Sequence, residues 1–187
     1  YEKACRNFGG SFIEFTENAA LSLNPFTLVA DIDEDMELLQ PLLAQMVSPR
    51  ESLDGFQYST LGAAIKKVWK AKGNTMKVSD VHDLLATGRL DEDSRDEDRR
   101  LKDLAAMLHP YTREGVYGKY FESDATIDFS SDFIVLELEE LKAKKDLQTV
   151  VLLIMMYRIT REMYFSRERK KIVIIDDKKI DRPLAAG

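Results

Sequence analysis

The chain has 187 residues, of which 44% are hydrophobic and 32% are charged, so it can bury a sizeable core beneath an ionic surface. Its 27 lysines and arginines against 33 aspartates and glutamates give a net charge of −6, which argues against a general duplex-DNA coat. The single cysteine, Cys5, excludes an internal disulfide framework and a multi-cysteine metal site.

The first 30 residues predict the end of a helix, a short strand and an extended corner. Apolar side chains of residues 1–8 follow helical spacing, and Gly9-Gly10 is a stop signal. Residues 11–15 read as a short strand. Pro25 biases Asn24 away from the helical region, which indicates an extended corner.

From Asp31 to about residue 110 the apolar pattern becomes helical. The first predicted helix carries an apolar stripe as far as Val47, and Pro41 inside it predicts a kink or a split. Residues 48–51 have the spacing of a capping box, with proline at the first helical position. A longer helix is expected from about Tyr58 to Lys72.

Two further helices are predicted before residue 110. Ser79 is expected to cap a short helix that ends at Gly88. The charged run 91–100 holds six acids and three arginines and is read as a solvated loop leading into a helix. Ser94 and Glu97 have capping-box spacing for that helix.

The last part of the chain predicts a β-α-β unit. Residues 133–136 are apolar on both faces, as in a parallel strand covered on both sides. Residues 139–165 are mostly helical, and the apolar centre of this helix predicts burial on all sides. Residues 172–175 repeat the pattern of a buried strand. The fold class is therefore α/β, with parallel strands and a helical block of roughly 90 residues between the first two.

The sharpest chemical signal is Ile172-Val173-Ile174-Ile175-Asp176, the pattern of a Walker B strand. A buried parallel strand delivers Asp176 to the sheet edge where α/β proteins bind ligands, and there the carboxylate can hold the Mg²⁺ of a nucleotide. Any buried strand followed by an acidic turn gives the same pattern. The partner motif, G-x-x-x-x-G-K-[ST], does not occur in these residues.

Three glutamates follow the second predicted strand. Glu137, Glu139 and Glu140 are interpreted first as negative charge at a helix start. The alternative places them at the same ligand-binding edge as Asp176, because the carboxyl ends of parallel strands converge.

The remaining candidates favour structural roles. His82 and His109 lack a second ligand at metal spacing, and Cys5 lies on an apolar helix face. Four lysines surround Trp69 and are interpreted as a solvated helix face rather than a phosphate contact: Lys66, Lys67, Lys70 and Lys72.

Four segments in series resemble TraC-type ATPases of conjugative type IV secretion systems. They are "YEKACRNFGGSFIEFT" with "LNPF", "LHPYTREGVYGKYF", "FIVLELEELKAKKDLQTVVLLIMM" and "KIVIIDD". The resemblance covers nearly all of residues 1–177 and keeps the same order. It implies a partial RecA-like P-loop core with a large all-helical insertion.

The resemblance also implies domain boundaries. Residues 1–30 are the first part of the RecA-like core, 31–120 the helical insertion, and 121–177 the second part of the core, ending at Walker B. Residues 178–187 form a tail that is either native or foreign to the protein. On this reading the chain is the middle of a longer ATPase and lacks Walker A.

The resemblance implies ATP and Mg²⁺ as cofactors of the intact parent and none for this fragment, which we expect to be inactive alone. Asp176 takes the Walker B role, bound to Mg²⁺ through water. Asp177 occupies the position of the family's catalytic glutamate, one methylene shorter, and Lys178-Lys179 replace the family's usual Ala-Trp. The shorter carboxylate reaches its water less well, which slows hydrolysis.

The implied setting is the bacterial cytoplasm, peripheral to the inner membrane, with other type IV secretion components as partners. Homo-oligomerisation of the parent is left open, and nucleic acid is not favoured as a partner. The alternative function is a non-catalytic helical interaction module that docks onto secretion components. In that case Asp176 is only an acid at a strand end.

Overall fold

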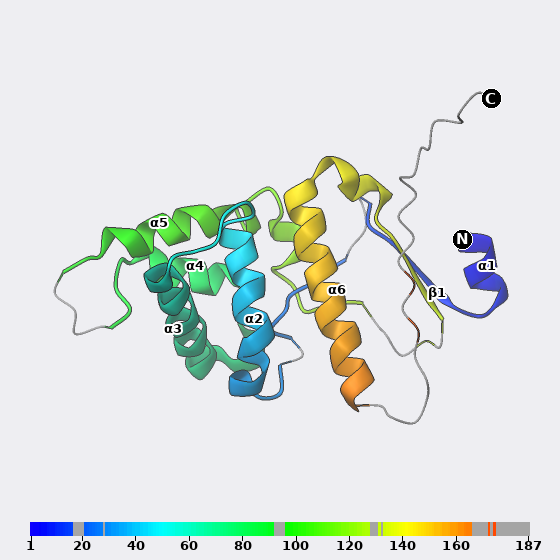
Figure 1. Cartoon of the computed structure of the whole chain (residues 1–187), viewed down its shortest axis with the longest axis horizontal. Helices are drawn as coiled ribbons and strands as arrows, with labels where there is room; N and C mark the ends of the chain where they lie inside the picture. Colours follow the sequence, from blue (N-terminus) through cyan, green and yellow to red (C-terminus); the bar gives the residue numbers. More distant parts are fainter. Residues whose placement is uncertain are drawn as a thin grey trace, which may run out of the picture.

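The structure is a computed structural model that describes residues 1–16, 21–27, 29–91, 96–127, 131, 133–165, 172 and 174, with the side chains of 162–165 left aside. Helices α2 to α5 form a block at one end, the strands and α1 lie at the other, and α6 stands between them (Figure 1). The helices are α1 (Glu2–Asn7), α2 (Ile32–Val47), α3 (Gly55–Lys72), α4 (Val78–Ala86), α5 (Arg99–Leu108) and α6 (Lys145–Phe165). The strands are β1 (Ser11–Glu14) and β2 (Ile134–Glu137), and short 3₁₀ helices are η1 (Gly73–Thr75), η2 (His109–Tyr111), η3 (Gly118–Tyr120) and η4 (Glu139–Ala143).

The two strands pair in parallel, as the sequence predicts, with Ser11 opposite Ile134 and Glu14 opposite Glu137. In chain order the helices α2 to α5 stand between them. Strand β2 was expected to be buried on both faces, and this is wrong because all its residues are only half-buried. Burial on both faces requires a covering layer on each side of a strand, and β2 does not have both.

The third predicted strand falls mostly outside the described residues, and so do Asp176 and Asp177. Its two described residues, Ile172 and Ile174, belong to no strand and are 84% and 85% exposed. The expected burial of this segment is therefore wrong at these two positions. They lack the covering layers that a buried strand needs.

Helix α2 confirms the predicted start and apolar stripe. The side chain of Asp31 accepts hydrogen bonds from the backbone N–H groups of Asp33 at 2.8 Å and Glu34 at 3.4 Å, which caps the helix. The helix is not split at Pro41 but continues through it to Val47. The buried stripe extends along both halves of the helix, and this shared packing offsets the roughly 3 kcal/mol that an internal proline costs.

Two expected helix caps differ from the structure. Residues 48–54 are non-helical, and α3 begins instead with a capping box in which Asp54 and Gln57 bond each other's backbone N–H groups at 2.7 and 3.0 Å. Ser79 lies within α4 and is buried. It does not cap the helix because its hydroxyl donates to Glu122 at 2.6 Å and accepts from the backbone N–H of Arg113 at 2.9 Å.

Helix α5 begins after Asp98, whose carboxylate accepts from the backbone N–H of Arg100 at 2.9 Å. The predicted cap Ser94 lies outside the described residues. The glycine stops predicted at Gly9 and Gly88 are confirmed by φ angles of +67° and +71° after α1 and α4. Gly73, with φ +54°, follows α3 in the same way.

Helix α6 is less buried than its composition suggests. Leu152, Leu153 and Met156 are 41%, 41% and 44% exposed, so the expectation of burial on all sides is wrong. Their spacing places them on one side of the helix, opposite the buried residues Val150, Val151 and Ile154. Of the helices in the described part of the chain, none is long and apolar enough to cross a membrane.

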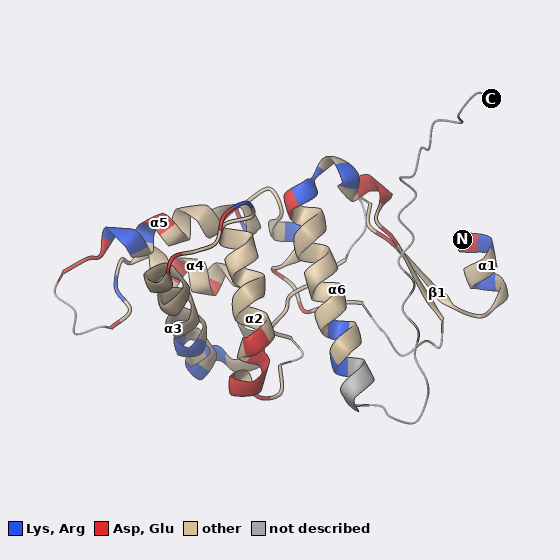
Figure 2. Ribbon diagram, in the orientation of Figure 1, with Lys and Arg blue, Asp and Glu red and all other residues tan. Residues whose placement is uncertain are grey.

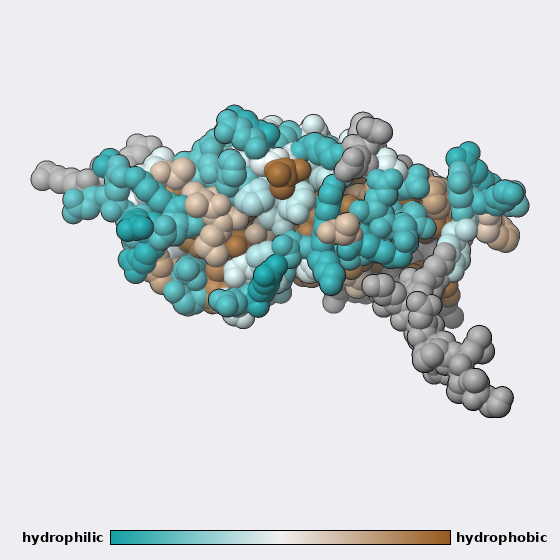
Figure 3. All heavy atoms as spheres, turned by 90° about the horizontal axis from the view of Figure 1, so that it is seen from above, coloured by the Kyte–Doolittle hydropathy of each residue, from teal (hydrophilic) through white to brown (hydrophobic). Residues whose placement is uncertain are grey.

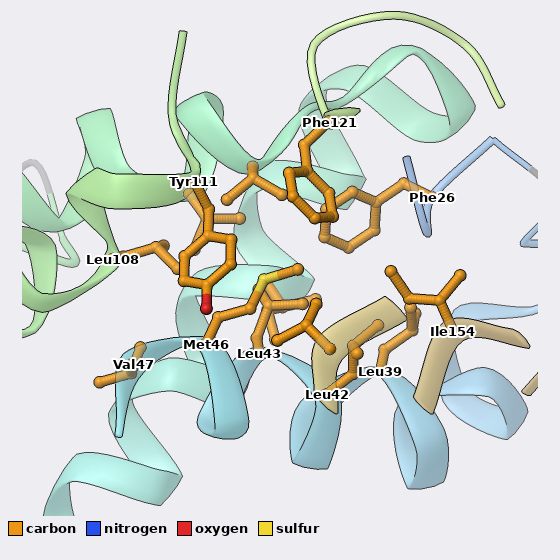
Figure 4. Close-up of a cluster of buried hydrophobic side chains, with 14 of the residues drawn as sticks. Phe26, Leu39, Leu42, Leu43, Met46, Val47, Leu108, Tyr111, Phe121 and Ile154 are labelled. Atoms are coloured by element: carbon orange, nitrogen blue, oxygen red, sulfur yellow. The ribbon is translucent and has the colours of Figure 1, made fainter. Parts of the chain in front are cut away.

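A single buried cluster connects the strands, the helical block and α6. The close-up in Figure 4 shows side chains from α2, α6 and the segments around Tyr111 and Phe121 converging. The cluster also takes in Phe15, which follows β1. On the face seen from above, polar side chains cover most of the surface, with apolar areas between them (Figure 3). This core includes residues on both sides of positions 30 and 120, so it does not separate the domains that were predicted to meet there. Those two boundaries remain predictions.

Gly118 lies where two backbone segments touch. A Cβ atom there would lie 2.0 Å from the carbonyl oxygen of Thr112, so Gly118→Ala should lower the free energy of unfolding by about 1–3 kcal/mol. Gly55→Ala is the matched control, since a Cβ at Gly55 meets nothing within 4 Å and alanine suits the first turn of α3. Urea denaturation of both variants checks this; equal stability would contradict the close approach.

Candidate functional site

The carboxyl ends of β1 and β2 bring two acids together. Glu14 and Glu137 are register partners at the last position of each strand, so their side chains leave the same face of the sheet. Glu14 is exposed and Glu137 half-buried. The backbone N–H of Phe15 donates to the carbonyl of Glu137 at 3.1 Å, which extends the pairing one residue further.

The chain after β2 adds two more acids to this edge. Leu138 leads into η4, which begins with Glu139 and Glu140, both exposed. The Lys142 ammonium donates to the Glu139 carboxylate. Glu137 is the last residue of β2, and Glu139 and Glu140 begin η4, so the predicted place of the three glutamates at the strand's carboxyl end is confirmed. Their role in binding a ligand stays a prediction.

Glu14 was not predicted as a site residue. The signal was available only in part, because the sequence showed a strand ending near Phe15 but not the register that places Glu14 beside Glu137. Carboxylate oxygens are the donors that Mg²⁺ prefers. Within the described ranges, however, no three His, Cys, Asp or Glu side chains gather closely enough to hold a metal ion. Asp176 and Asp177 lie outside those ranges.

The two histidines meet in the helical block, although the sequence did not indicate it. The ring centroids of His82 and His109 are 5.8 Å apart at an angle of 51°. His82 Nδ1 lies 2.9 Å from one carboxylate oxygen of Asp83, and Arg113 Nη2 lies 3.5 Å from the other. Cys5 is fully buried, as expected of a core residue.

Lysines gather at the C-terminal turns of α3 (Figure 2), and most of them form ion pairs with aspartates. Lys66 contacts Asp33 at 2.5 Å and Lys72 contacts Asp80 at 2.6 Å. The Lys67 ammonium donates to the backbone carbonyl of Leu90. This pairing supports the interpretation of a solvated helix face over a phosphate contact.

A polar cluster joins the start of α2 to α6. Arg161 Nη1 donates to both carboxylate oxygens of Asp35 at 3.2 and 3.1 Å, and the Tyr157 hydroxyl donates to Asp35 at 2.9 Å. The Asp35 and Arg161 side chains are only 13% and 15% exposed. Burial, followed by the hydrogen bond to Asp35, raises the pKa of Tyr157 to about 12, so the phenol remains a donor at neutral pH.

A cavity lies away from the sheet edge. It has a volume of about 350 Å³ and opens between the second half of α2 and the loop that leads to α3. Pro41, Gln45, Arg50 and Tyr58 are among its lining residues.

Comparison with known proteins identifies relatives of this chain. The sequence model of a family described as the TraG P-loop domain matches residues 1–181. Protein TraC of Escherichia coli strain K12 is 31% identical over 182 residues, covering 95% of this chain and 20% of TraC. The chain therefore spans about a fifth of the length of this relative.

The fold is similar to that of VirB4 of Thermoanaerobacter pseudethanolicus. The TM-score is 0.71 at 16% sequence identity, and the match covers 89% of this chain and 67% of the VirB4 chain. At this identity the likeness concerns the fold alone.

Proposed function

Because the chain belongs to the TraG P-loop domain family, we propose that it is the middle section of an ATPase that powers conjugative type IV secretion and pilus assembly. The observation that carries the proposal is the family match over residues 1–181, which includes the motif ending at Asp176. Membership confirms the resemblance stated from the sequence. The proposed activity is that of the intact protein of which this chain would be a part.

In the proposed mechanism the sheet edge provides carboxylates. Asp176 would hold the Mg²⁺ of the nucleotide, and Asp177, at the position of the family's glutamate, would orient the attacking water. Glu14 and Glu137 lie at the carboxyl ends of the described strands, where ligands of parallel sheets bind. When bound, Mg²⁺ would neutralise charge on the phosphates and ATP would supply the phosphoryl group. The part of the chain's own carboxylates would be to hold the metal ion and to orient the water.

The proposed architecture is a partial RecA-like core, residues 1–30 and 121–177, with residues 31–120 inserted. The parallel pairing of β1 with β2, with α2 to α5 between them in chain order, supports it. The proposed location is the bacterial cytoplasm at the inner membrane, with other secretion components as partners. The fragment alone is proposed to be inactive, because the Walker A motif is not among its residues.

The test compares ATP hydrolysis by the purified intact parent and by this chain. We expect Mg²⁺-dependent hydrolysis by the parent and none above background by the chain. Substantial activity in the chain that Asp176→Ala abolishes would overturn the inactivity of the fragment. An intact parent that neither binds nor hydrolyses ATP would overturn the ATPase proposal itself.

The second candidate is a non-catalytic interaction module that docks onto secretion components. The helical block favours it, since α2 to α5 pack on one another around buried side chains such as Leu43, Ile65 and Leu104. Asp176→Asn in the parent separates the two candidates. It should leave partner binding and transfer unchanged if the module is non-catalytic.

A further inference from the structure

Helices α2 and α6 lie side by side and run in opposite directions (Figure 1). The contact of Asp35 with Tyr157 and Arg161 fixes their alignment at one end. One helical turn further from this contact come Leu38 on α2 and Leu153 on α6. These two leucines therefore occupy matching positions along the pair.

Apolar side chains line the outer side of this helix pair. Leu38 is 44% exposed, Leu153 and Leu152 are each 41% exposed, and Met156 is 44% exposed. We call these four residues the α2/α6 seam. On α6 the spacing of 152, 153 and 156 is that of a single helix face, so the seam is a continuous strip rather than scattered residues.

One end of the seam adjoins a cavity. Pro41 lies one turn beyond Leu38 on α2, is exposed, and lines the cavity of about 350 Å³ together with Tyr58. A strip of apolar residues that ends in a concave site resembles the grooves that receive an amphipathic helix, in which one larger side chain enters a pocket.

The seam has an acidic border on α2. Glu34 and Glu37 are exposed, lie on the outer side of α2 next to Leu38, and make no ion pair with any cation that the structure describes. Figure 2 shows acids concentrated at this end of α2. An anionic lipid surface would be repelled there, whereas basic side chains would be attracted.

We propose that the α2/α6 seam docks an amphipathic helix of a partner protein whose apolar stripe is bordered by lysine or arginine. The apolar stripe covers Leu38, Leu153 and Met156, and the basic border faces Glu34 and Glu37. The proposal does not depend on ATP hydrolysis, because none of these residues belongs to the sheet edge.

The test uses the full chain and two synthetic helical peptides that share a leucine stripe, one bordered by lysines and the other by glutamates. Fluorescence anisotropy should show the lysine peptide binding at least about tenfold more tightly, with the preference shrinking at high salt. The double variant Glu34→Lys/Glu37→Lys should reverse this order. A reversal requires contact at this border and not mere attraction to an acidic protein.

Variants of the apolar residues locate the site. Leu153→Ser should weaken binding of the lysine peptide by about tenfold, because it removes a central apolar contact. Val116→Ser is the matched control: Val116 is 78% exposed but lies in a turn outside α2 and α6, and its replacement should change nothing. Thermal unfolding of each variant shows whether the fold is intact.

Three results would overturn the proposal. The first is equal binding by wild type and a folded Leu153→Ser variant, and the second is a charge preference that Glu34→Lys/Glu37→Lys does not reverse. The third is concentration-dependent self-association in sedimentation that Leu153→Ser abolishes, which would assign the seam to a second copy of the chain.

Discussion

Asp176→Asn, introduced into the intact parent protein, is expected to lower the rate of ATP hydrolysis by about 100-fold or more and to abolish transfer. The substitution keeps the size of the side chain but removes the charge that is proposed to hold Mg²⁺ through water. Without that charge, the metal ion would be held less firmly beside the phosphates. It would then stabilise less well the negative charge that develops during phosphoryl transfer. A coupled assay of ADP release, run across a Mg²⁺ titration, measures the effect.

Two controls make this result specific. Asp103→Asn removes the same charge from an exposed position on α5 and should leave the rate unchanged. Asp177→Glu restores the longer carboxylate of the family and should raise the rate if residue 177 orients the water. An Asp176→Asn parent that retains full activity would contradict the Walker B assignment and leave the interaction module as the better candidate.

The types and order of the elements could be predicted from the sequence because they depend on local periodicity. The change from the strand at 11–14 to helices from residue 32, and back to a strand at 134–137, follows the spacing of apolar residues. Glycine stops at Gly73 and Gly88 are local as well, since each needs only a positive φ angle.

Helix starts were harder to predict because several residues competed for each cap. Ser79 has the chemistry of a cap but lies within α4, where its hydroxyl bonds Glu122 from a distant part of the chain. Pro41 breaks the local rule and is tolerated through packing on both sides of it. In both cases tertiary contacts outweigh a local preference.

The candidate site was predictable only where it follows from strand ends. Glu137, Glu139 and Glu140 could be placed at a sheet edge from the sequence, whereas Glu14 joins them through a register that pairs residues 123 positions apart. The exposure of Leu153 and Met156 on an apolar helix was equally hidden, because composition does not reveal which side of a helix lacks a neighbour.

Asp35→Ala is expected to lower the free energy of unfolding by about 3–5 kcal/mol. It leaves the Arg161 guanidinium, whose side chain is 15% exposed, without the carboxylate that accepts its hydrogen bonds at 3.1 and 3.2 Å. It also removes the acceptor of the Tyr157 hydroxyl at 2.9 Å and of the Ala30 backbone N–H at 3.1 Å. The loss reflects buried donors that no longer have a charged acceptor, which costs more than the pair itself contributes.

Asp33→Ala is the matched control for that variant. Asp33 lies two residues earlier on the same helix and pairs with Lys66, but the two side chains are 76% and 52% exposed, so its loss should cost less than about 1 kcal/mol. The double variant Asp35→Leu/Arg161→Met should be more stable than Asp35→Ala, since it replaces both buried charges of the pair by apolar side chains. Urea denaturation of the full chain measures all three. If Asp35→Ala costs no more than Asp33→Ala, this cluster does not hold the helical block against α6.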